Sequence, residues 1–168
     1  MTEATRQPMS QAMNKAARLV LMGFDVDGVL TDGSLYFSSL GDEIKAFCSL
    51  DGHGLKMLQR AGVEVAIISG RSSRALELRA ANLGLAELAA QRGIGLEQTG
   101  YRGDDVVDLP ILRVCGFSAA VPDAHSEVLA RVDYVATRSG GRGAVREVCD
   151  LILRAHDKWA TAMAEYFA

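Results

Sequence analysis

Phe24-Asp-Val-Asp-Gly-Val-Leu-Thr-Asp-Gly33 is the stretch that decides the fold of this chain. It begins where the mostly apolar run from Arg18 to Phe24 ends, and such a run is typical of a strand buried on both faces. Asp25 and Asp27 therefore stand at the end of a buried strand. Uncompensated carboxylates are costly in that position, and oxygen ligands favour magnesium among the metals. The stretch predicts a Mg²⁺ site at a strand end.

The same two aspartates are suited to phosphoryl transfer. An aspartate such as Asp25 can attack a phosphoryl group, and a second carboxyl group such as Asp27 can protonate the leaving oxygen and then activate water. Gly28 lets the chain turn sharply and bring backbone N–H groups toward phosphate oxygens. An acidic turn after a strand is the alternative for the two aspartates alone, and the full stretch makes it the weaker one.

Two further strand ends carry polar residues. The apolar run from Val63 to Ile68 predicts a strand, after which Ser69 and Gly70 offer a hydroxyl and a backbone N–H at a helix N-terminus, a ready anion site. Gly103-Asp-Asp105 follows another candidate strand, and Asp104 can supply a further oxygen to the metal. The alternative for Ser69 is simple helix capping. The alternative for the aspartates is a solvated helix N-terminus, where the helix dipole favours Asp.

Alternation of strand and helix predicts an α/β fold, a Rossmann-like parallel sheet with helices on both faces. The length leaves no room for a second domain, so no cap domain is expected. Residues 1–17 are expected to be an N-terminal tail and residues 18–168 a single domain. Residues 33–47 predict a β-hairpin, which we call the flap. The other expected elements are helices over 54–61, 109–114 and 144–167, strands over 117–121 and 134–136, and only a short or irregular strand in 93–103.

Composition limits the function classes. The chain has 168 residues, a net charge of -3 and three cysteines without the paired spacing of a zinc site. A protein with this charge lacks the basic surface of a nucleic-acid binder. The sequence shows no signal peptide and no membrane span, so we expect a cytoplasmic protein with no nucleic-acid or membrane partner.

Taken in order, several motifs resemble the haloacid dehalogenase superfamily of phosphatases, in its 3-deoxy-D-manno-octulosonate 8-phosphate phosphatase branch. The resemblance covers most of the chain. It rests on Asp25-Val-Asp-Gly-Val-Leu-Thr-Asp-Gly33, Lys45-Ala-Phe47, Asp51-Gly-His-Gly54, Ile67-Ile-Ser-Gly-Arg71, Gly103-Asp-Asp105, Val121-Pro-Asp-Ala-His125 and Gly140-Gly-Arg-Gly-Ala-Val-Arg-Glu-Val-Cys-Asp150.

The resemblance implies a hydrolase of lipopolysaccharide biosynthesis that converts 3-deoxy-D-manno-octulosonate 8-phosphate to the free sugar acid and phosphate through an aspartyl-phosphate. It implies a homotetramer in which the flap and C-terminal segment of neighbours cover the site. The implied catalytic roles are Asp25 as nucleophile and Asp27 as general acid and base. Mg²⁺ would be held by Asp25, the Asp27 carbonyl and Asp104. Ser69 and Gly70 would bind the phosphate, and Asp51, Arg71 and Arg142 would contact the substrate.

One departure from the family pattern keeps alternatives open. The family places a lysine between the serine motif and the Gly-Asp-Asp motif, whereas this chain has no lysine between Lys56 and Lys158, and a strand before that lysine is missing between Leu85 and Gln98. The missing lysine motivates one alternative, a catalytically impaired relative that binds a ligand. Within the phosphatases, a nine-carbon sialic-type acid phosphate is the competing substrate, and the sequence does not separate the two sugar acids. A phosphorylation-driven receiver domain explains the motifs least well.

Overall fold

A parallel five-stranded sheet forms the centre of the computed structural model, which describes residues 3–69 and 80–167. The strand order is β4-β1-β5-β6-β7. The strands are β1 (Leu21–Phe24), β4 (Glu64–Ile67), β5 (Thr99–Arg102), β6 (Phe117–Ala120) and β7 (Tyr134–Val135). β1, β5 and β6 are buried along their whole length, as expected of strands covered on both faces.

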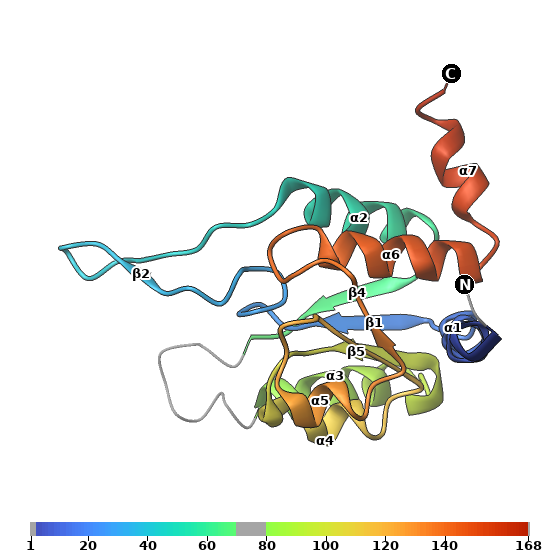
Figure 1. The fold of residues 1–168 in the computed structure, drawn as a ribbon, viewed down its shortest axis with the longest axis horizontal. Helices are drawn as coiled ribbons and strands as arrows, with labels where there is room; N and C mark the ends of the chain where they lie inside the picture. The colour runs from blue at the N-terminus through green and yellow to red at the C-terminus, as the bar shows by residue number, and fades with distance from the viewer. Residues whose placement is uncertain (1–2, 70–79, 168) are drawn as a thin grey trace.

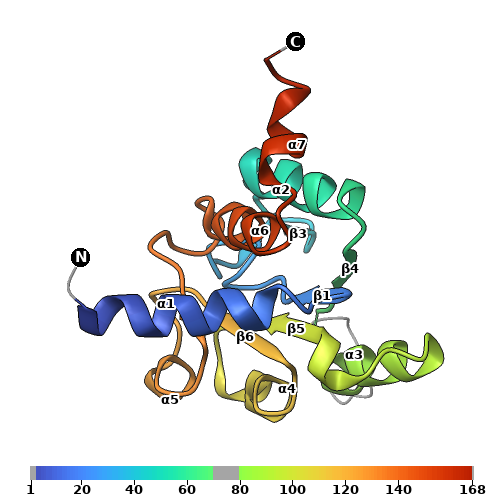
Figure 2. The same ribbon diagram turned by 90° about the vertical axis from the view of Figure 1, so that its right-hand side faces the viewer.

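Helices cover both faces of this sheet (Figures 1 and 2). On one face α2 (Ser49–Arg60) packs against α6 (Ala144–Ala155), and on the other lie α3 (Ala80–Gln91), α4 (Leu109–Leu112) and α5 (Ser126–Leu129). Two apolar cores result, one on each side of the strands. The predicted α/β architecture is confirmed. Short 3₁₀ turns, η1 (Leu96–Gln98) and η2 (Val106–Asp108), flank β5.

The strand order reverses at β1. The chain leaves β1 toward α2 on one face, crosses through β4 and α3, and returns to the other side of β1 as β5. In open parallel sheets, ligands bind beyond the carboxyl ends of the strands at such a reversal. The fold therefore places a site at the ends of β1 and β5.

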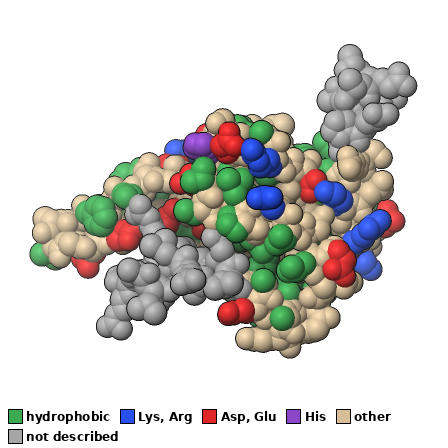
Figure 3. All heavy atoms as spheres, turned by 90° about the horizontal axis from the view of Figure 1, so that it is seen from below, with side chains coloured by type: hydrophobic (Ala, Val, Ile, Leu, Met, Phe, Trp, Pro, Cys, Tyr) green, Lys and Arg blue, Asp and Glu red, His purple; other side chains and the backbone are tan. Residues whose placement is uncertain are grey.

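The flap is a hairpin of β2 (Tyr36–Phe37) and β3 (Glu43–Ile44), as predicted. It extends away from the sheet on the side of the carboxyl ends (Figure 1). Its tip turns at Gly41, whose φ of 88° favours glycine. Figure 3 shows hydrophobic side chains on the projecting left end of the molecule. The exposed large apolar side chains of the flap are Leu35, Tyr36, Phe37, Leu40, Ile44 and Phe47.

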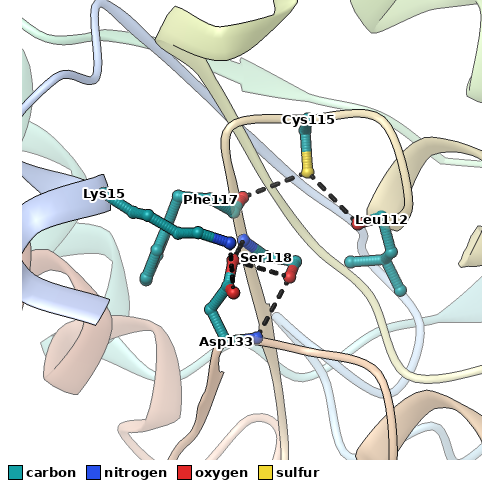
Figure 4. A network of polar contacts seen from close by, with 6 residues as sticks. All are labelled: Lys15, Leu112, Cys115, Phe117, Ser118 and Asp133. Atoms are coloured by element: carbon teal, nitrogen blue, oxygen red, sulfur yellow. Dashed lines mark hydrogen bonds and ion pairs between the residues drawn. The ribbon is translucent and has the colours of Figure 1, made fainter. Parts of the chain in front are cut away.

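Residues 1–17, expected to be a tail, contain helix α1 (Glu3–Ala16). α1 lies across the amino-terminal ends of the strands (Figure 2), where Ala12 and Ala16 are buried in the core. Lys15 pairs with Asp133 at 2.5 Å, and Asp133 accepts hydrogen bonds from the backbone N–H and hydroxyl of Ser118, both 3.0 Å long (Figure 4). The polar composition of residues 1–17 did not predict this helix, because its apolar face consists of a few small residues.

The C-terminal region forms two helices where one was predicted over 144–167. α6 ends at Ala155, and α7 (Trp159–Ala164) leaves in a new direction (Figure 1). Asp157 between them has a φ of 55°, a left-handed conformation that no α-helix continues through. Trp159 still packs against the core, with the Arg154 guanidinium 4.0 Å from the centre of its ring.

The segment before Gly103 forms a more regular strand than expected. β5 is fully buried in the middle of the sheet and pairs with both β1 and β6. α2 begins at Ser49, five residues before the predicted start. None of the helices within residues 3–69 and 80–167 is long and apolar enough to cross a membrane.

Candidate active site

Three strand ends meet where the sequence placed its polar motifs. In the parallel register, Phe24 of β1 lies opposite Ile67 of β4 and Arg102 of β5. The residues that follow continue this pairing, since the Asp25 N–H donates to the Arg102 carbonyl at 3.0 Å and the Ile68 N–H to the Phe24 carbonyl at 2.9 Å. Asp25, Ser69 and Gly103 consequently leave the sheet at one edge.

Carboxylate oxygens of Asp25, Asp104 and Asp108 lie within 4.8 Å of one another at this edge. Gly28, with a φ of 84°, makes room for them, because a Cβ atom on Gly28 would lie 2.0 Å from Oδ2 of Asp104. Half-buried oxygen ligands from two loops match the preference of Mg²⁺. The predicted pair of Asp25 and Asp104 is thus brought together, with Asp108 in addition.

The cluster is electrostatically incomplete without a cation. Burial, followed by repulsion from Asp108, raises the pKa of Asp25 to about 7. The same two causes in the same order raise the pKa of Asp104 to about 7. Asp108 is buried, but its carboxylate accepts hydrogen bonds from the Asp104 N–H at 3.0 Å and the Tyr101 hydroxyl at 3.2 Å. A divalent ion supplies the positive charge that this arrangement calls for.

These raised pKa values predict an unusual stability profile for the protein freed of divalent metal. Folded Asp25 and Asp104 retain protons up to about pH 7, whereas the ordinary pKa of an aspartate is 3.8. The folded state binds more protons in this window, so its stability should fall as the pH rises from about 4 to about 7. After allowance for solvent screening, we expect a loss of roughly 2 kcal/mol.

Melting temperatures measured across that pH range with a chelator test this expectation. Asp104→Asn should flatten the profile, and Mg²⁺ added at neutral pH should raise the melting temperature of the wild type only. A chelated wild type with the same pH profile as Asp104→Asn would contradict the assignment.

Neighbouring loops fix the loop that carries Asp25. The buried hydroxyl of Thr31 donates to the Val26 carbonyl at 3.3 Å and accepts from the Gly33 N–H at 3.2 Å. Gly140 approaches so closely that an added Cβ would lie 1.8 Å from the Gly28 carbonyl oxygen. The glycine-rich loop over 140–143 is therefore part of the wall beside the cluster.

Asp27 lies outside the three-carboxylate cluster and faces the flap. The Lys45 ammonium donates to Oδ1 of Asp27 and also pairs with Glu43 at 2.8 Å. The hydrogen bond to Asp27 raises the pKa of Lys45. In the sequence, Lys45 belongs to the family motif Lys45-Ala-Phe47, and the sequence alone predicted no role for it. The signal was its place in the predicted flap, which directly follows the motif that carries Asp25 and Asp27.

Asp51, predicted as a substrate contact, is buried beneath the glycine-rich loop. Its Oδ1 accepts the Arg146 N–H at 2.7 Å and its Oδ2 the Gly143 N–H at 3.2 Å, so it stabilises the start of α6. Buried Arg102 lies in the same region and donates to the Ala144 carbonyl. The structure gives Asp51 this supporting position, and a direct contact with substrate stays a prediction.

Asp51→Ala should destabilise the protein by about 3 kcal/mol. It removes the acceptor of the Gly143 and Arg146 N–H groups and a negative charge near Arg102. Urea denaturation of the variant and of Asp51→Asn, which keeps one acceptor oxygen, measures this effect. Asp51→Asn should lie between the alanine variant and the wild type. A loss below about 1 kcal/mol for Asp51→Ala would mean that the carboxylate does not support the loop.

Four predicted residues remain to be placed. Ser69 is half-buried and follows Ile68 at the edge that carries Asp25. Gly70 and Arg71 lie outside the described residues. Arg142 is exposed, and its guanidinium lies 3.8 Å from the carboxylate of Asp32 beside the glycine-rich loop.

The segment between Leu85 and Gln98, where the family lysine is missing, consists of the rest of α3 and a 3₁₀ turn. Its arginine, Arg92, pairs with Glu64 at the first residue of β4, the end of the strand opposite Asp25. This segment brings no positive charge to the carboxylates. β4 is consequently the edge of the sheet among the described strands.

Comparison with known proteins identifies the family. The 3-deoxy-D-manno-octulosonate 8-phosphate phosphatase of Salmonella typhi is 42% identical over 163 residues, covering 89% of this chain and 87% of the relative. The Yersinia pestis enzyme is 44% identical over 160 residues, covering 87% and 86%. The chain belongs to this phosphatase family, a branch of the haloacid dehalogenase superfamily. No protein-family model matches the chain.

Solved structures of the family share the fold. The Moraxella catarrhalis phosphatase, in complex with magnesium ion, phosphate ion and KDO, has a TM-score of 0.85 at 40% identity, covering 94% of this chain and 99% of that one. The cobalt-bound Haemophilus influenzae phosphatase has a TM-score of 0.78 at 41% identity, covering 89% and 99%. The Moraxella structure holds magnesium, a divalent cation of the class that fits the carboxylate cluster.

Proposed function

We propose that this chain is a magnesium-dependent phosphatase that hydrolyses 3-deoxy-D-manno-octulosonate 8-phosphate to the free sugar acid and phosphate. The observation that carries the proposal is the convergence of Asp25 and Asp104 within 4.8 Å at the carboxyl ends of β1 and β5. The similarity to phosphatases of this substrate, at about 42% identity over most of the chain, supports the choice of sugar acid.

The chemistry follows from the positions of two carboxylates. An oxygen of Asp25 attacks phosphorus, the bond from phosphorus to the ester oxygen breaks, and that oxygen takes a proton from Asp27. Asp27 then takes a proton from water, whose oxygen attacks phosphorus and releases phosphate from Asp25. Mg²⁺ held by Asp25, Asp104 and the Asp27 carbonyl supplies positive charge that draws the phosphate toward the nucleophile.

The remaining predicted residues take supporting roles in this proposal. Ser69 and Gly70 bind the transferring phosphate, and Arg71 and Arg142 contact the sugar acid. The half-buried position of Ser69 beside Asp25 and the exposure of Arg142 support these roles. We further propose a cytoplasmic enzyme of lipopolysaccharide biosynthesis.

We also propose a homotetramer in which the flap of one copy contacts another. The exposed apolar side chains of the flap support it, since monomeric proteins rarely expose apolar patches of this kind. Light scattering of the purified protein gives the subunit number, and a monomeric mass at micromolar concentration would contradict this assembly.

Phosphate release from purified protein tests the activity. Release from 3-deoxy-D-manno-octulosonate 8-phosphate should depend on Mg²⁺ and stop with a chelator. A nine-carbon sialic-type acid phosphate, assayed in parallel, should give a lower kcat/KM. Equal and negligible release with Mg²⁺ and with chelator would overturn the proposal in favour of a ligand-binding relative.

A further inference from the structure

The flap carries a cation into an otherwise acidic site. Lys45 follows β3, yet its ammonium reaches Oδ1 of Asp27 in the loop after β1. The two side chains are only 22% and 20% exposed, so this pair is sheltered from solvent more than most surface ion pairs. Lys45 thus links the flap to the active-site loop.

Glu43 holds the same ammonium from the other side, at 2.8 Å. A lysine ammonium has three N–H donors, and Asp27 and Glu43 take two of them. Among residues 3–69 and 80–167 no third acceptor contacts this ammonium, so its third N–H can serve an acceptor that enters between the flap and the carboxylates. A phosphate group placed at Asp25 provides oxygens of that kind.

The charges of the active site favour a hydrogen bond from Lys45 to the substrate phosphate. Asp25, Asp27, Asp104 and Asp108 gather four carboxyl groups where an anionic substrate must bind. One divalent ion does not offset four carboxylates and a phosphate. Between Leu85 and Gln98 the only cation, Arg92, pairs with Glu64 at the far end of β4, so that segment leaves the deficit in place.

We propose that Lys45 is a positioning residue and electrostatic partner of the phosphoryl group in this active site. Glu43 and Asp27 fix its ammonium, which in turn orients the Asp27 carboxylate and donates to a phosphate oxygen. The inference deepens the proposed function and rests on it, since the acceptor is the substrate phosphate. The positive charge beside the phosphoryl group then comes from the flap, and not from residues 85–98, where the family lysine is missing.

Three variants test this role in steady-state assays with Mg²⁺. Lys45→Met should lower kcat by about a hundredfold with a smaller change in KM, because its charge acts most strongly on the transition state. Lys45→Arg, which keeps the charge, should recover at least part of that loss. Lys56→Met is the matched control: it removes an exposed lysine of α2 and should stay within about twofold of the wild type.

Melting temperatures separate this role from a structural one. The flap buries little, so Lys45→Met should melt within about 2 °C of the wild type. A Lys45→Met kcat equal to that of Lys56→Met would overturn the proposal. So would a loss of activity that only follows a loss of folding in all Lys45 variants.

Binding of orthovanadate with Mg²⁺, measured by calorimetry, provides a readout that needs no turnover. Lys45→Met should bind vanadate at least about tenfold more weakly than Lys56→Met. If the wild type binds vanadate but releases no phosphate, the proposed function fails and the vanadate comparison still decides the role of Lys45. Equal vanadate affinities, or no binding by the wild type, would overturn the Lys45 assignment.

Discussion

Asp25→Asn is expected to reduce phosphate release by more than about a thousandfold, because an amide cannot form the acyl phosphate. The same change should stabilise the protein freed of metal. It removes one of the half-buried negative charges whose mutual repulsion raises the pKa values of Asp25 and Asp104. Activity and stability should therefore move in opposite directions.

Phosphate release and melting temperature, both measured with and without Mg²⁺, test this pair of effects. Asp105→Asn is the control. Asp105 is exposed, and its carboxylate caps the short turn η2 by accepting the Val106 N–H at 2.7 Å and the Asp108 N–H, contacts for which asparagine keeps one acceptor oxygen. It should keep activity within about threefold. Substantial phosphate release by Asp25→Asn would remove Asp25 from the role of nucleophile.

Gly28→Ala should weaken Mg²⁺ binding and lower kcat/KM by about a hundredfold or more. The new methyl group would occupy the space of the Asp104 carboxylate, 2.0 Å from its Oδ2, and displace a metal ligand. Gly28 also has a φ of 84°, a conformation that costs an alanine on the order of 1 kcal/mol.

Gly41→Ala separates the two effects of that substitution. Gly41 has a φ of 88°, and an added Cβ would meet nothing within 4 Å. It therefore suffers similar backbone strain without displacing a ligand. Mg²⁺ titrations followed by calorimetry should show weakened binding for Gly28→Ala alone. Equal Mg²⁺ affinities in both variants would show that Asp104 is not a ligand.

The sequence was most informative where polar residues follow strands. Asp25 and Asp104 were predicted to share a site because parallel strands end at one edge, and the register of β1 with β5 brings them together. Local patterns sufficed there. Buried strands, turns and glycines with positive φ all have short-range signatures.

Features that depend on distant contacts could not be predicted in the same way. The pairing of Lys45 with Asp27 depends on the course of the flap in space, and the buried position of Asp51 depends on where α6 begins. α1 was missed because its apolar face consists of small residues such as Ala12 and Ala16, which give little hydrophobic periodicity. Tertiary packing decided these three outcomes.

Helix α1 closes the end of the sheet that lies farthest from the active site. It covers the amino ends of the strands (Figure 2), and Lys15 ties it to Asp133. Asp25 and Asp104 lie at the opposite, carboxyl ends of β1 and β5. Affinity tags that require trimming into residues 3–16 would strip a buried surface from the sheet. Preparations made that way should yield less folded enzyme, with unaltered turnover in each molecule that folds.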